Sequence, residues 1–143
     1  MSISSRFSVG IHILSLLVIK KDNVNSSEYI ASSVNTNPVV IRKIMGMLKN
    51  AGLIHIRPGV AGAELARDYS KITLLDVYKA VNVVAENELF STHDNPNPAC
   101  LVGRNIQDAI DPLFSAAQLA MEKELEGVSL KEVIDHIMSK QEG

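Results

Sequence analysis

Apolar residues recur at intervals of three and four along most of this chain, a spacing that is typical of amphipathic helices. Residues 5–20 form the first such stretch, and polar residues 21–23 provide an exit turn. A second, shorter helix is predicted over residues 26–34, because Asn25 and Glu28 stand at the spacing of a capping box. The stripe expected to be buried in the first helix consists of Phe7, Ile11, Leu14 and Val18.

The best-defined predicted helix begins after Asn37 and ends at Gly52. Asn37 is a suitable N-cap, Pro38 fits the first helical position, where its missing N–H is harmless, and Gly52 is a common terminator. Asn35 tolerates the left-handed conformation and can form the turn before this helix. Two capped helices joined by a tight turn predict a helix-turn-helix, a DNA-binding motif. The buried face is expected to carry Val40, Ile44, Met47 and Leu48, with Arg42, Lys43 and Lys49 outside it.

A β-hairpin is predicted directly after this helix. Residues 53–57 alternate like a strand, residues 58–62 are rich in turn formers, and residues 63–66 have the pattern of a returning strand. Helix, turn, helix and hairpin in this order define a winged helix. Arg57 and Arg67 flank the hairpin, where DNA phosphates can lie.

Beyond the wing, the sequence predicts a short helix, then a loop and, near the C-terminal end, a second short helix. Thr73 and Asp76 have the spacing of a capping box and begin the first of them. Residues 91–98 combine polar side chains with prolines, which indicates a loop. Ser129 and Glu132 repeat the capping spacing and predict a short final helix. The apolar face of the first helix is expected to contain Leu74, Val77, Ala80, Val81 and Val84.

A long helical stripe of apolar residues, ending at Gly127, precedes that final helix. Pro112 interrupts the stripe and either begins the helix or kinks it. The stripe exceeds what a small domain can cover, so a dimer interface is favoured over a helix folded back on its own domain. We therefore predict a mostly α fold with a small β-hairpin, in which residues 1–82 form a winged helix-turn-helix DNA-binding domain. Residues 83–143 form a loop and a C-terminal dimerisation and sensor region. The residues assigned to the dimer interface are Ile106, Ile110, Leu113, Phe114, Ala117 and Met121.

The charges divide unevenly along the 143 residues, whose formal net charge is −2. Residues 1–67 hold eight basic and three acidic side chains, a net charge of +5, and the remainder holds six basic and 13 acidic ones, a net charge of −7. The basic half is also the half with the helix-turn-helix pattern. This asymmetry indicates a surface that faces an anion, with double-stranded DNA as the expected partner.

Several classes of protein are disfavoured by the sequence. No Ser/His/Asp grouping, Gly-rich phosphate loop or metal-spaced cluster is visible, so we expect no enzyme, cofactor or metal site. No apolar run is long enough to span a bilayer, and the N-terminus lacks the pattern of a signal peptide. The single cysteine excludes an intrachain disulfide and fits a cytoplasmic protein.

Three segments together give the chain a family resemblance. They are residues 49–53 at the end of the predicted recognition helix, residues 57–67 in the wing and residues 72–81 after it. In these segments the chain resembles the Rrf-two family of bacterial winged-helix regulators, whose members include an iron–sulfur cluster regulator and a cysteine-metabolism repressor.

The resemblance implies a homodimeric transcription factor, usually a repressor, with a long C-terminal dimerisation helix. Two recognition helices related by such a dimer predict an inverted-repeat operator. The resemblance also implies that Arg57 enters the minor groove. Independently of the resemblance, Gly59 lets the wing backbone approach a surface closely. The recognition-helix residues that the resemblance places toward DNA are Thr36, Asn37, Pro38, Val39, Arg42 and Lys43.

The chain departs from the cluster-binding members at Cys100. Those members carry three closely spaced cysteines before the dimerisation helix, whereas this chain has only one there, so an iron–sulfur cluster is not expected. Cys100 can be a small buried hydrophobic residue, a relic of a lost cluster site, or a redox-sensing thiol near Arg104. Two alternative functions also stay open: a winged helix that binds protein, and a regulator that responds to a small molecule without redox sensing.

Overall fold

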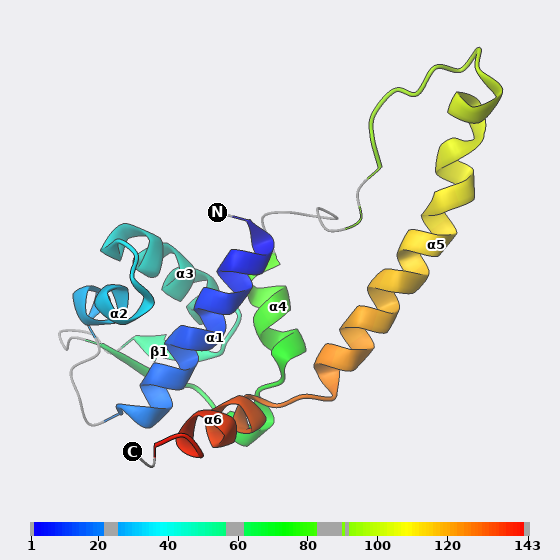
Figure 1. Ribbon diagram of the computed structural model, residues 1–143. Coiled ribbons are helices and arrows are strands. Elements are labelled where there is room, and N and C mark those ends of the chain that lie inside the picture. Colours follow the sequence, from blue (N-terminus) through cyan, green and yellow to red (C-terminus); the bar gives the residue numbers. More distant parts are fainter. Residues whose placement is uncertain (1, 22–25, 57–61, 83–89, 91, 142–143) are drawn as a thin grey trace.

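The computed structural model describes residues 2–21, 26–56, 62–82, 90 and 92–141. The described part is mainly helical and contains one two-stranded antiparallel hairpin, which confirms the predicted fold class (Figure 1). In chain order the elements are α1 (Ile3–Ile19), α2 (Ser27–Val34), α3 (Pro38–Asn50), β1 (Ile54–Ile56), β2 (Ala63–Leu65), the 3-10 helix η1 (Tyr69–Lys71), α4 (Leu74–Asn82), α5 (Leu101–Glu126) and α6 (Leu130–Met138).

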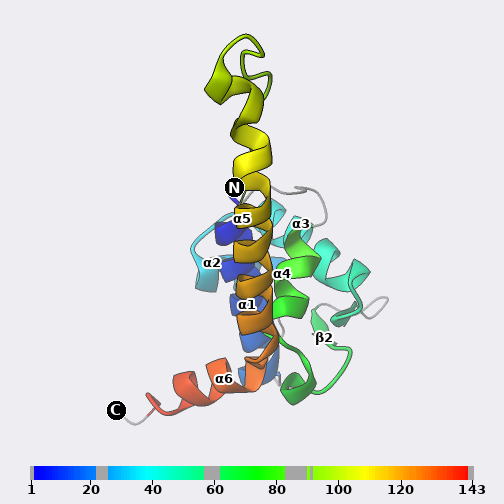
Figure 2. The ribbon, with the colours of Figure 1, turned by 90° about the vertical axis from the view of Figure 1, so that its right-hand side faces the viewer.

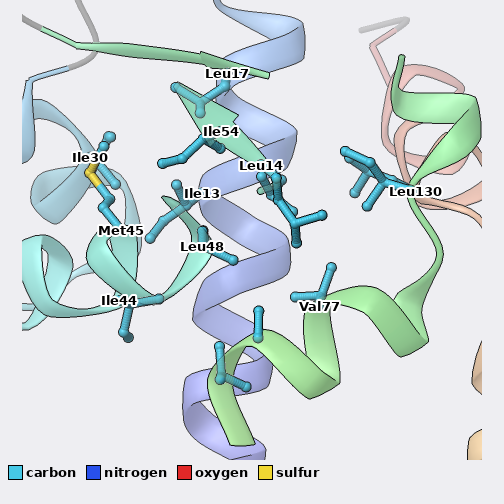
Figure 3. Packing of buried hydrophobic residues seen from close by; sticks show 14 of the residues in the cluster. Ile13, Leu14, Leu17, Ile30, Ile44, Met45, Leu48, Ile54, Val77 and Leu130 are labelled. Carbon is cyan, nitrogen blue, oxygen red and sulfur yellow. The ribbon is translucent and has the colours of Figure 1, made fainter. Parts of the chain in front are cut away.

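A single main core lies around α1, with α2 and α3 on one side and α4 and α6 on the other (Figure 3). The helices α1 and α4 approach closely at Gly10, where an added Cβ would lie 3.1 Å from Cγ1 of Val77. Because α1 contacts several elements at once, its buried residues do not follow the predicted single stripe. Its fully buried residues include Ile13 and Leu14, whereas Phe7, Ile11 and Val18 are only partly buried.

The wing is a short hairpin anchored at its base. Ile54 pairs with Leu65, and Ile56 with Ala63. Ile54 is buried in the core, but Ile56 is 43% exposed, so the predicted alternation fails at the outer end of β1, where the hairpin leaves the core. The predicted wing-tip residues Arg57 and Gly59 lie outside the described residues.

The helix α5 projects away from the domain and joins it only near its C-terminal end (Figures 1 and 2). It begins at Leu101, so Pro112 lies inside the helix and does not begin it. Met121 and Leu125 pack against Leu75 and Tyr78 of α4. The chain then turns at Gly127 into α6, which rejoins the main core through Leu130 and Ile134.

Candidate nucleic-acid interface

The turn between α2 and α3 has the predicted geometry, although α2 begins differently from the prediction. Ser26 is the N-cap of α2, and its Oγ accepts a hydrogen bond from the N–H of Tyr29 at 3.1 Å. The predicted capping box at Asn25 is therefore wrong, since the adjacent serine takes this role; Asn25 itself lies outside the described residues. Asn35 adopts the left-handed conformation with a φ of 68°, as predicted, and this φ turns the chain toward α3.

The start of α3 also agrees with the prediction. Asn37 Oδ1 accepts a hydrogen bond from the N–H of Val40 at 3.0 Å, and Pro38 occupies the first helical position. The buried face, however, is rotated from the predicted one, because α3 packs against α1, α2 and α4 together. Val40 and Met47 are only partly buried, and the buried residues are Ile41, Ile44, Met45 and Leu48.

The predicted DNA-facing residues of α3 form one patch at its N-terminal end. Thr36 and Pro38 are partly exposed, and Asn37, Val39, Arg42 and Lys43 are exposed. Val39 is notable because a large apolar side chain on this patch is 65% exposed. The Arg42 guanidinium lies 3.9 Å from the Glu28 carboxylate, but both side chains are mostly exposed, so this pair is weak.

A groove of about 420 Å³ separates α3 from the wing. Arg42, Gly46 and Lys49 lie on the same face of α3 at intervals of three and four residues and form one wall. A Cβ on Gly46 would meet no atom within 4 Å, so the groove is open at this point. Ile56 and Gly62 of the wing also line the groove. Lys49, which lines this groove, is outside the predicted DNA-facing set, although its spacing of seven residues from Arg42 puts it on the same face of α3.

Arg67 does not stand alone beside the wing, as its predicted role in binding phosphate suggested. Its guanidinium lies 3.3 Å from Oδ2 of Asp76 on α4, and the two side chains are 44% and 33% exposed. The predicted capping box of α4 is present, since Thr73 Oγ1 accepts from the N–H of Asp76 and Asp76 Oδ2 accepts from the N–H of Thr73. Asp76 therefore holds a helix start and an arginine at the base of the wing.

Cys100 is exposed and stands at the N-cap position of α5, where its side chain makes no capping hydrogen bond. This exposure contradicts the interpretation of Cys100 as a buried hydrophobic residue within its own chain. The Cys100 N–H donates to the carbonyl of Asn97 at 3.2 Å. A Cβ on Gly103 would clash with that same Asn97 carbonyl, so the cysteine loop packs tightly on the first turn of α5.

The residues assigned to a dimer interface are not equivalent in the structure. Leu113 is 67% exposed, and Ala117 is exposed as well. Ile106, Ile110 and Phe114 are partly buried, and Phe114 lies against Phe90 with ring centroids 5.8 Å apart. Met121 instead packs on its own domain. The C-terminal end of α5 thus follows the alternative to a dimer interface, a helix folded back on its own domain.

Comparison with known proteins agrees with this geometry. The Rrf2 family model, described as an iron-dependent transcriptional regulator, matches residues 3–136. The chain belongs to the Rrf2 (Rrf-two) family. It is 52% identical, over 94% of its length and 98% of the relative's, to a Bacillus subtilis (strain 168) protein provisionally named HTH-type transcriptional regulator YwnA.

Solved structures show the same fold. A crystal structure provisionally described as a DNA-binding protein is 46% identical and superposes with a TM-score of 0.73, covering 90% of this chain and 98% of that one. Oxidised CymR of Staphylococcus aureus is 23% identical, with a TM-score of 0.65 over 94% and 96% of the two chains, and shows the fold alone. The protein is thus a winged helix-turn-helix transcription regulator of the Rrf2 family, and its relatives are regulators rather than enzymes.

Two further observations concern metals and membranes. Within the part of the chain that the structure describes, no group of three or more His, Cys, Asp or Glu side chains is placed to hold a metal ion. Among the same residues, no helix combines the length and apolar character needed to cross a bilayer.

Proposed function

We propose that this regulator is a homodimeric repressor that binds an inverted-repeat operator and responds to oxidation at Cys100. The observation that carries the DNA-binding part is the exposed patch at the start of α3, which combines a capped helix N-terminus with Arg42 and Lys43. An α-helix fits the major groove of B-DNA, where base edges can be distinguished. Repression follows from the family resemblance, in which a bound dimer usually blocks transcription.

The DNA contacts divide between the two grooves. Thr36, Asn37 and the exposed Val39 face the bases of the major groove, where an apolar side chain can contact a thymine methyl group. The wing residues Arg57 and Gly59 reach the adjacent minor groove. One DNA backbone separates these two grooves, so it must pass between α3 and the wing. The groove walled by Arg42 and Lys49 is where its phosphates would lie.

Dimerisation through the outward face of α5 supplies the second recognition helix. A single helix in one groove makes too few contacts for specific binding. Leu113 is exposed on a helix that projects from the domain, and such an apolar surface is typical of an interface. The dimer places two α3 helices about one turn of DNA, roughly 34 Å, apart.

Cys100 is the proposed sensor because it is exposed and is attached to the start of the dimerisation helix. A peroxide oxidises its thiolate to a sulfenic acid, with reduction of the peroxide O–O bond to water. The sulfenic acid then condenses with a second thiol, forming an S–S bond and releasing water. That thiol comes from Cys100 of the other subunit or from a small thiol, because each chain has one cysteine. The Asn97–Gly103 packing transmits the change to α5.

A response to a small molecule is the second candidate, and a cavity favours it. A cavity of about 620 Å³, partly open to solvent, lies between Phe90, Thr92 and one side of α5. Phe114 and Leu119 provide an apolar wall, and Gln118 a polar group. This volume falls within the range of ligand sites.

Operator selection with purified protein tests the proposal. Genomic DNA fragments of the source organism are selected by the parent and by Cys100→Ser, each with and without mild peroxide. We expect both proteins to enrich the same inverted repeat, and peroxide to release only the parent. Enrichment of no fragment contradicts DNA binding. Equal release of both proteins, or of neither, contradicts sensing at Cys100 and leaves the small-molecule alternative.

A further inference from the structure

The segment from Ile72 to Asp76 joins two distant parts of the molecule. At one end, the Asp76 carboxylate accepts from the N–H of Thr73 at 2.9 Å and pairs with Arg67 at 3.3 Å. The same segment also contacts the corner between α5 and α6, where Thr73 forms an isolated antiparallel bridge with Ser129. The base of the wing and the end of α5 are therefore bonded to the same five residues.

The wing needs this second anchor because its own hairpin is small. Each strand has three residues, and a two-stranded hairpin of this size is marginally stable in isolation. The first strand is anchored by the buried residues Leu53 and Ile54. The return strand is followed two residues later by Arg67, whose pair with Asp76 fixes where the chain leaves the hairpin.

The ion pair is additional to what the helix start requires. A capping box needs only an acceptor side chain at the third position, and Asp76 already supplies it to Thr73. Arg67 is thus held by a carboxylate whose own orientation is fixed by the helix start. The Arg67 and Asp76 side chains are only 44% and 33% exposed, and this partial burial strengthens the ion pair relative to a fully exposed one.

The corner of α5 and α6 is bonded to the other side of the segment at two more points. Leu74 N–H donates to the carbonyl of Val128 at 2.9 Å, and Leu130 N–H donates to the carbonyl of Ile72 at 2.8 Å. A movement of the α5 end must therefore displace the segment or break these bonds. The same movement reaches the wing through Asp76 and Arg67.

We infer that Asp76 is a positioning residue for the wing, which it couples to the dimerisation helix through Arg67. The inference rests on the proposed function, in which the wing contacts DNA. The Arg67–Asp76 pair lines a cavity with Met47 and Leu53, and this cavity adjoins the groove walled by Arg42 and Lys49, since Asn50 lines both. A competing explanation is that Arg67 contacts a DNA phosphate directly and that Asp76 only competes for it.

A double-mutant cycle distinguishes the two explanations. Operator affinity and its salt dependence are measured for the parent, Asp76→Asn, Arg67→Met and the double variant. The asparagine keeps a side-chain oxygen for the N–H of Thr73 but removes the negative charge and replaces the second oxygen with an NH₂ donor. We expect each single variant to bind about fivefold more weakly, and the double variant no more weakly than either single variant. The salt slope should stay at the parent value, because no phosphate contact is lost.

The matched control is Asp135→Asn, which breaks the Lys131–Asp135 pair of α6 at 2.6 Å and should leave affinity unchanged. Amide exchange at His55 and Glu64 of the wing should accelerate in Asp76→Asn, while exchange at Ile13 of the core stays slow. The inference is overturned if Asp76→Asn binds like the parent or more tightly, while Arg67→Met lowers the salt slope by about one. A parent that binds no operator would instead refute the proposed function itself.

Discussion

The side-chain oxygen of Asn37 accepts a hydrogen bond from the backbone N–H of Val40, 3.0 Å away, inside the patch proposed to meet DNA. We expect Asn37→Ala to lower the free energy of unfolding by about 1 kcal/mol, because the cap of α3 is lost. Asn37→Asp keeps a capping oxygen and should preserve stability, but its charge repels phosphate, so operator binding should weaken. Thermal melts and binding titrations measure the two effects separately. Full binding by the aspartate variant would place Asn37 away from the DNA.

Lys49 is expected to contact a phosphate in the groove between α3 and the wing. Lys49→Ala should weaken binding to all DNA sequences alike and reduce the slope of log affinity against log salt by about one. Lys140→Ala removes another exposed cation, beyond α6, and serves as the control. Titrations at several salt concentrations provide both slopes. Identical slopes for the parent and Lys49→Ala would exclude this contact.

The exposed side chain of Leu113 is expected to lie in the dimer interface. Leu113→Asp would bury an unpaired charge there, at a cost of roughly 3–5 kcal/mol, and should yield monomers in light scattering. Ser115→Asp places the same charge on the opposite side of α5 and should leave the mass unchanged. A dimer that persists in Leu113→Asp would assign the interface to another surface.

Close packing at Gly10 should make the junction of α1 and α4 sensitive to a single methyl group. In Gly10→Ala the new Cβ would lie 3.1 Å from Val77, and we expect a loss of about 1–3 kcal/mol in the free energy of unfolding. Gly46→Ala meets no atom within 4 Å and should be neutral or up to about 1 kcal/mol stabilising, as alanine favours helix. Urea denaturation of both variants makes the comparison. Equal stabilities would contradict the tight contact.

Acid should destabilise the protein through His12, which is hydrogen-bonded to Ser33 at 2.9 Å. Burial lowers the pKa of His12 below its ordinary value of 6.5, so the unfolded chain binds this proton more readily than the folded one. The free energy of unfolding should therefore fall as the pH decreases from about 6.5 to the lowered pKa of folded His12, and this loss is complete below that pKa. Thermal melts between about pH 7.5 and pH 5 should show a smaller decrease for His12→Gln than for the parent. An identical pH dependence in the parent and in His12→Gln would contradict this effect.

Short-range hydrogen bonds account for the parts of the fold that the sequence predicts well. The caps at Asn37 and Thr73 and the left-handed turn at Asn35 each involve residues within four positions of one another. Such contacts depend on local backbone geometry, so residue type and spacing suffice to locate them. By itself, the sequence thus determines the order of the helices, the hairpin and the exposed, basic start of α3.

Contacts between distant segments were decided only by the tertiary structure. The buried face of α3 includes Ile41 and Met45 because α1, α2 and α4 all pack against this helix. The periodicity of apolar residues along one helix does not reveal how many neighbours that helix has. Met121 belongs to an apolar stripe in the sequence, yet it packs on its own domain because the C-terminal end of α5 lies against Leu75 and Tyr78 of α4. Asp76 has the sequence signature of a cap, whereas its pair with Arg67 exists because the folded chain brings the end of the wing to the start of α4. Which residues meet across such distances depends on how the helices pack in three dimensions, and spacing along the chain does not specify that packing.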